Sequence, residues 1–211
     1  MGWIQLCGVA WGVGVGIGIG GIARGIADRF AMAHPISFGW CEAAGAASCA
    51  GIGWWGATNQ VTAEVLVSMI AVTALVGWSI AASAVDIAVR RLPNVLTCAG
   101  FAAAVGYGVV TGAAATPVMG SALLSASYLA AYLCAPGSVG AGDVKLALGT
   151  GGAASFGGAD CWLAAGAGAP LITALVGAGF ALLRSRSMST SLPHGASMCL
   201  ATVCSVLVVA V

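Results

Sequence analysis

Two acidic residues lie beside polar turns in a chain that otherwise has few charged side chains. Asp86 occurs in SAVDIAVRRLPNVLT (83–97), and Asp143 occurs in GSVGAGDVKLALG (137–149). Two carboxyl groups that come close together cannot both ionise, and they then share one proton. The ionised member activates a water molecule, and the protonated member donates to a carbonyl or a leaving amine. The two residues therefore predict aspartyl-protease chemistry, which requires no metal, serine or thiol.

The residues around Asp143 have types that suit a loop at such a site. Gly140 and Gly142 are expected to let the backbone turn tightly and a substrate strand come close. Lys145 is expected to orient the loop or to contact lipid phosphate.

A second polar turn follows Asp86. Arg90 and Arg91 are expected to orient this turn, contact lipid phosphate or pair with an acidic residue. Pro93 ends the turn, and Asn94 is predicted to be the N-cap of the next apolar span.

Each of these residues also has a purely structural explanation. Asp86 and Arg90 have the four-residue spacing of an ordinary helical ion pair. Asp143 has the position of a helix cap. The basic residues are also typical of anchors that fix membrane topology.

Other kinds of site have little support in the sequence. The histidines, His34 and His194, are far apart, so a Ser–His or Cys–His arrangement is not favoured. The cysteines form no C-x-x-C pair, and we interpret them as small packing residues rather than zinc ligands or disulfides. We therefore expect neither a metal nor a cofactor. The cysteines are Cys7, Cys41, Cys49, Cys98, Cys134, Cys161, Cys199 and Cys204.

The composition defines the environment of these residues. The chain has 211 residues, of which 60% are hydrophobic and 6% are charged, whereas soluble domains have about 25% charged residues. A water-facing surface cannot be covered with so few charges, but a bilayer accepts an apolar exterior. The net charge of +1 gives no basic patch for nucleic-acid binding. We predict an all-α, polytopic transmembrane helical bundle.

Apolar segments predict about eight spans, or seven if a short one does not cross, with the N-terminus outside. Gly12, Gly16 and Gly20, together with Gly14 and Gly18 on a second track, predict a helix-packing face rather than a phosphate-binding loop. The predicted spans are 3–22, 41–57, 61–82, 95–112, 117–135, 144–157, 161–183 and 194–211.

The basic residues support this topology. With eight spans, all of them lie on one side, which the positive-inside rule makes cytoplasmic. Without a span at 41–57, two of them would lie on the opposite side. The same topology places both acidic residues at the cytoplasmic face. The basic residues are Arg24, Arg29, Arg90, Arg91, Lys145, Arg184 and Arg186.

The motifs DIAVRRLPN (86–94) and GAGDVKL (140–146) resemble those of the type IV prepilin peptidases, membrane aspartyl proteases of the G-x-G-D type. The resemblance covers roughly residues 34–211. It implies that Asp86 and Asp143 are the catalytic pair.

The N-terminal part departs from the family pattern. Full-length members carry a cysteine-rich insert, associated with methylation, between the first two spans. Here GGIARGIADRF (20–30) and HPISFGWCE (34–42) are separated by only a few residues. The resemblance therefore implies a short form without methyltransferase activity. Residues 1–40 would form the first span and a shortened cytoplasmic loop, and residues 41–211 the protease domain.

The resulting hypothesis is an endopeptidase of the bacterial inner membrane whose active site faces the cytoplasm. It would remove the short basic leader of prepilin-like precursors, with the precursor and membrane lipid as partners. Three alternatives are a transporter or channel with proton-carrying acids, a non-catalytic assembly partner, and an intramembrane protease for other substrates. The near absence of polar groups in mid-span disfavours the transporter.

Overall fold

The computed structural model describes residues 2–30, 39–60, 62–135, 137, 139–183 and 193–210. These residues form eight α-helices, one short 3-10 helix and no strand, which confirms the all-α prediction. The elements are α1 (Trp3–Phe30), α2 (Trp40–Thr58), α3 (Ala63–Val89), α4 (Asn94–Val110), α5 (Ala115–Cys134), α6 (Ala141–Ala154), η1 (Ser155–Gly157), α7 (Gly158–Leu183) and α8 (His194–Ala210).

Each predicted span corresponds to a helix, but several boundaries differ. The first and third spans were expected to end at residues 22 and 82, whereas α1 continues to Phe30 and α3 to Val89. The polar ends of these helices have low hydropathy, so a prediction from hydropathy alone makes the spans too short. Asp86 thus lies inside α3. Arg184 and Arg186 lie outside the described residues.

The helices are those of a membrane protein. Four segments are long and apolar enough to cross a bilayer: Trp3–Phe30, Ala63–Val89, Ala115–Cys134 and Ala141–Leu182. The helices Asn94–Val110 and His194–Val209 are apolar but shorter. Large apolar side chains, such as those of Trp3, Leu182 and Val208, are exposed on the outer surface. A bilayer solvates such a surface, as the composition predicted.

Glycines of α1 pack directly on α2. A side chain at Gly12, Gly16 or Gly20 would overlap the α2 backbone, so only glycine permits this approach. The predicted packing face is confirmed for this track. Gly14 and Gly18 face open space, so the second track is not part of the contact.

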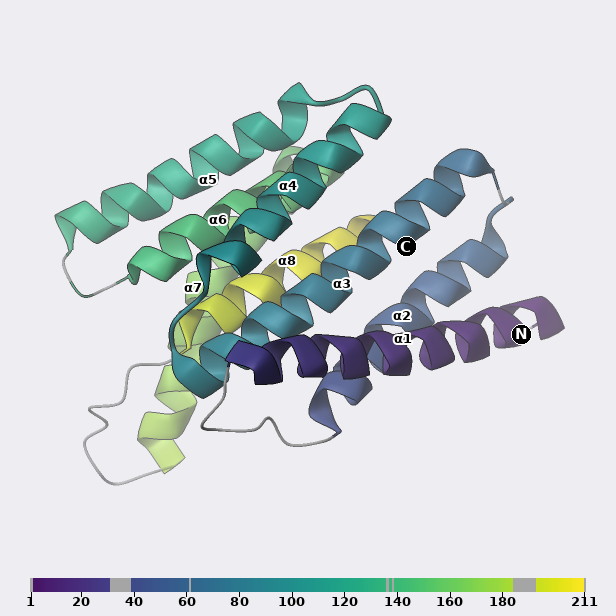
Figure 1. Cartoon of the computed structure of the whole chain (residues 1–211), viewed down its shortest axis with the longest axis horizontal. Coiled ribbons are helices and arrows are strands. Elements are labelled where there is room, and N and C mark those ends of the chain that lie inside the picture. The colour runs from purple at the N-terminus through teal and green to yellow at the C-terminus, as the bar shows by residue number, and fades with distance from the viewer. Residues whose placement is uncertain are drawn as a thin grey trace.

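The helices are arranged so that α3 and α8 lie between the α1–α2 pair and the group formed by α4, α5 and α6 (Figure 1). Helix α8 contacts α3, α6 and α7. The C-terminal end of α3 and the N-terminal ends of α4, α6 and α8 lie at the same end of the bundle, on the left in Figure 1. Polar residues at these four helix ends are therefore close in space.

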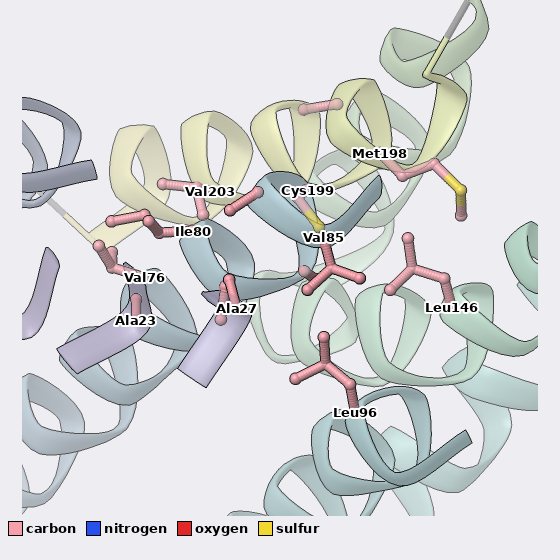
Figure 2. Packing of buried hydrophobic residues seen from close by; sticks show 14 of the residues in the cluster. Ala23, Ala27, Val76, Ile80, Val85, Leu96, Leu146, Met198, Cys199 and Val203 are labelled. Carbon is pink, nitrogen blue, oxygen red and sulfur yellow. The ribbon is translucent and has the colours of Figure 1, made fainter. Parts of the chain in front are cut away.

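A buried apolar layer lies next to this polar end. Val85, Leu96, Leu146 and Met198 come from α3, α4, α6 and α8 and belong to one core cluster (Figure 2). Val85 directly precedes Asp86, and the other three lie within the first turns of their helices. The layer excludes water from the bundle interior just beyond the acidic residues.

The cysteines divide into two groups. Four are buried, in agreement with a packing role, and four are exposed on the outer surface. All eight are free thiols. The buried group is Cys41, Cys49, Cys161 and Cys199.

Candidate active site

Asp86 lies in the last turn of α3. It is 7% exposed, and its Oδ2 accepts a hydrogen bond of 3.1 Å from the backbone N–H of Ala196 in α8. Arg90 ends the helix in the left-handed conformation, with φ at 54°, and this turn directs the chain toward α4. An ionisable group buried at the end of a membrane helix is a candidate functional residue, because its burial must be offset.

Asp143 is the third residue of α6 and is 9% exposed. Its Oδ2 accepts a hydrogen bond of 3.0 Å from the backbone N–H of Gly140. The structural explanation of Asp143 as a helix cap is therefore correct for this oxygen. Capping holds the carboxyl group at the end of the helix and does not exclude a chemical role.

The two acidic residues are brought together although they are far apart in the sequence. The carboxyl groups of Asp86 and Asp143 interact electrostatically with each other. Both are buried, and each accepts a hydrogen bond from a backbone N–H at the start of a helix. The donor is Ala196 for Asp86 and Gly140 for Asp143. The last turn of α3 and the first turn of α6 thus place two buried carboxyl groups at the same end of the bundle.

The glycines before Asp143 do not form the predicted tight turn. Gly140 has φ −82° and ψ 149°, an extended conformation that any residue adopts, so the expectation of a glycine-dependent tight turn is wrong. A Cβ at Gly140 would instead lie 3.2 Å from Oδ2 of Asp143, closer than most real contacts. A Cβ at Gly142 would make only ordinary contact with Leu92, at 3.7 Å.

Asn94 also has a different role from the one predicted. Pro93 occupies the N-cap position of α4, and Asn94 is the first residue of the helix. The Nζ of Lys145 donates a hydrogen bond of 2.8 Å to Oδ1 of Asn94. The prediction that Asn94 caps the helix is therefore wrong, because its side chain links α4 to α6 instead. Lys145 thus contacts the first residue of α4, and its expected role in orienting the loop stays a prediction.

The two arginines after Asp86 are exposed. The Arg90 guanidinium acts electrostatically on the Asp86 carboxyl. Arg91 lies in the same exposed turn, one residue before the partly buried Leu92. Both arginines are exposed at the end of α3, and the next two residues, Leu92 and Pro93, are partly buried.

His194 is part of the site, and the sequence reasoning missed it. It is the first residue of α8 and directly precedes Gly195 and Ala196, which lie against the Asp86 carboxyl. Its Nε2 lies 3.1 Å from the Tyr128 hydroxyl, and its Nδ1 lies 2.8 Å from the Thr173 hydroxyl. The available signal was a histidine at the first residue of the predicted span 194–211.

The arrangement has the groups needed for acid–base hydrolysis. A buried carboxyl pair that shares one proton can activate water with one member and donate a proton with the other. Among the residues that the structure describes, no group of three or more His, Cys, Asp or Glu side chains could hold a metal ion.

Comparison with known proteins adds one finding. Residues 73–211 match the sequence profile of a family described as the type IV leader peptidase family. The matched region runs from α3 to the end of the chain and includes both acidic residues. Neither the curated proteins nor the solved structures include a significant match.

Proposed function

This chain belongs to the type IV leader peptidase family, and from this membership we propose that it is an aspartyl endopeptidase acting on prepilin-like precursors. It removes the short basic leader of a single-span precursor at the cytoplasmic face of the bacterial inner membrane. Because no cysteine-rich insert separates residues 20–30 from residues 34–42, we expect no methyltransferase activity.

The observation that supports this proposal best is that Asp86 and Asp143, both buried, lie at helix ends that meet at the same end of the bundle. One carboxylate takes a proton from the attacking water, and the other carboxyl donates its proton to the carbonyl oxygen of the scissile peptide, which gives a gem-diol. When the gem-diol collapses, the C–N bond breaks, the first carboxyl gives its proton to the leaving amine, and a gem-diol hydroxyl returns a proton to the second carboxylate. The low-dielectric surroundings strengthen these interactions relative to water.

The fold also offers a place for the precursor helix. An apolar cavity of about 360 Å³ lies along α3, with Leu75, Trp78, Gly100 and Val206 among its lining residues. Trp78 precedes Asp86 by eight residues, which is about 12 Å along a helix. A precursor helix lying beside α3 with its cleavage site at the acidic pair would bring its first apolar turns to this cavity.

Substrate cleavage tests the proposal directly. The full chain, in membranes or purified in detergent, is incubated with a precursor that has a basic leader, a small residue before the cut and an apolar helix. We expect leader removal by the natural sequence and its loss in both Asp86→Asn and Asp143→Asn. General acid–base groups contribute about 10²- to 10⁴-fold to such rates.

Asp160 provides a matched control for these substitutions. It is an exposed acidic residue in the first turn of α7, beyond the far end of α6. Asp160→Asn should cleave at the natural rate. Unchanged cleavage in either active-site variant would falsify the assignment of the pair. A panel of other single-span precursors separates leader removal from general intramembrane proteolysis.

A further inference from the structure

The imidazole of His194 connects three helices. Its Nε2 lies 3.1 Å from the hydroxyl of Tyr128 in α5, and its Nδ1 lies 2.8 Å from Oγ1 of Thr173 in α7. The Tyr128 and His194 rings also lie near each other, with centroids 5.6 Å apart. The first residue of α8 is thus held from two sides.

The direction of these hydrogen bonds follows from the hydroxyl of Thr173. That hydroxyl donates its single proton to the backbone carbonyl of Ala169, at 3.0 Å. With the hydroxyl proton on this carbonyl, the Thr173 oxygen accepts from His194, and Nδ1 carries a proton. In a neutral ring, Nε2 has no proton and accepts from the Tyr128 hydroxyl. A single chain of donors therefore runs from Tyr128 through His194 and Thr173 to Ala169.

The residues that follow His194 contact Asp86. The N–H of Ala196 donates to Asp86. Gly195 lies so close to the same carboxyl that a Cβ there would be 2.9 Å from Asp86 Oδ2. A shift of the first turn of α8 would therefore change the position of Asp86 relative to Asp143.

We propose that His194 is a positioning residue of the peptidase, and this inference rests on the proposed function. Its neutral ring, protonated on Nδ1, fixes the first turn of α8 between Tyr128 and Thr173. The turn in this position presents the Ala196 N–H to Asp86 and keeps the two carboxyl groups in reach of each other. His194 acts through Asp86 and is not assigned a contact with the precursor.

Nitrogen NMR tests the ring state without any cleavage assay. The chain has two histidines, so His34→Gln leaves His194 as the single imidazole. We expect ¹⁵N signals of a neutral ring that is protonated on Nδ1, and we expect them to change in both Tyr128→Phe and Thr173→Val. A neutral ring protonated on Nε2 would overturn the inference.

Kinetics test the consequence for the reaction. His194→Phe and Tyr128→Phe should each lower kcat for leader removal about 10-fold, the typical effect of one lost hydrogen bond, and leave KM unchanged. The double variant should lose little more than either single variant, because both break the same chain. His194→Asn, which keeps a donor near the Nδ1 position, should recover part of the loss.

Tyr132 supplies the matched control. It lies one turn after Tyr128 on α5 and is 40% exposed, so Tyr132→Phe removes the same hydroxyl outside the site. Its kcat should equal that of the natural sequence. If the natural sequence cleaves the precursor and Tyr128→Phe and His194→Phe are equally fast, His194 has no positioning role. If the natural sequence does not cleave, the proposed function fails, and the NMR result still decides the ring state.

Discussion

The backbone N–H of Ala196 donates a hydrogen bond of 3.1 Å to Oδ2 of Asp86, which joins α8 to α3. The N–H of the third residue in a helix has no acceptor within that helix. Helix α8 therefore offers an unpaired donor, together with the positive end of its dipole, to a carboxyl group from a distant part of the chain. The position of Asp86 thus depends on α8 as much as on its own helix.

Loss of this donor should impair cleavage without unfolding the protein. Ala196→Pro removes the N–H, and proline is tolerated in the first turn of a helix. A hydrogen bond to a charged group contributes about 1.5–3 kcal/mol, so we expect leader removal to slow by roughly 10- to 100-fold. Cleavage rates measured by gel shift and thermal unfolding in detergent check both parts.

Ala196→Ser keeps the N–H and controls for the change of side chain. It should cleave within a few-fold of the natural rate. Equal rates for the proline variant and the natural sequence would show that this hydrogen bond does not matter for the reaction.

The rate of leader removal should depend on pH in a bell-shaped manner. A carboxyl pair is active only while one member is ionised and the other is protonated, so activity falls when both are protonated and when both are ionised. We expect kcat/KM for the precursor to decline at both ends of the measured range. His194 also lies in the site, so the profile is measured in parallel with His194→Gln, which has no titrating ring. A profile that is flat in both proteins would contradict the shared proton.

The sequence was sufficient to predict the helices and the location of the two acidic residues at one end of the bundle. Sparse charge and long apolar segments identify membrane helices, and the positions of the basic residues place Asp86 and Asp143 at the same end of the bundle. The motifs around them resemble a family to which the chain does belong. These features depend on composition and order along the chain, which a single sequence displays directly.

The side-chain hydrogen bonds between helices could not be predicted from the sequence in the same way. The contacts of His194 with Tyr128 and Thr173, and of Lys145 with Asn94, depend on how each helix is rotated about its axis. In a membrane the apolar pattern constrains rotation weakly, because both the lipid side and the core are hydrophobic. The Ala196 donor could not be predicted for a further reason. Nearly every residue type has a backbone N–H, so the residue type does not indicate this donor.

The contact between Lys145 and Asn94 should make a small contribution to the free energy of unfolding, and both side chains should be needed for it. The hydrogen bond of 2.8 Å links α6 to α4 at an exposed position, where net contributions are about 1 kcal/mol. Lys145→Met and Asn94→Ala should each lower the free energy of unfolding by about this amount and slow cleavage less than about 10-fold. If the two side chains act together, the double variant resembles the single variants. Fully additive losses would instead mean that the contact is not formed.

Close packing of α1 on α2 should make Gly16 far less replaceable than Gly18. A methyl group at Gly16 would overlap the backbone of Gly45, so Gly16→Ala must push the two helices apart. Overpacking of this kind costs about 1–3 kcal/mol, and we expect a lower unfolding temperature in detergent. Gly18 lies on the same helix in open space, so Gly18→Ala should be neutral or slightly stabilising. Equal unfolding temperatures for the two variants would show that α1 does not approach α2 this closely.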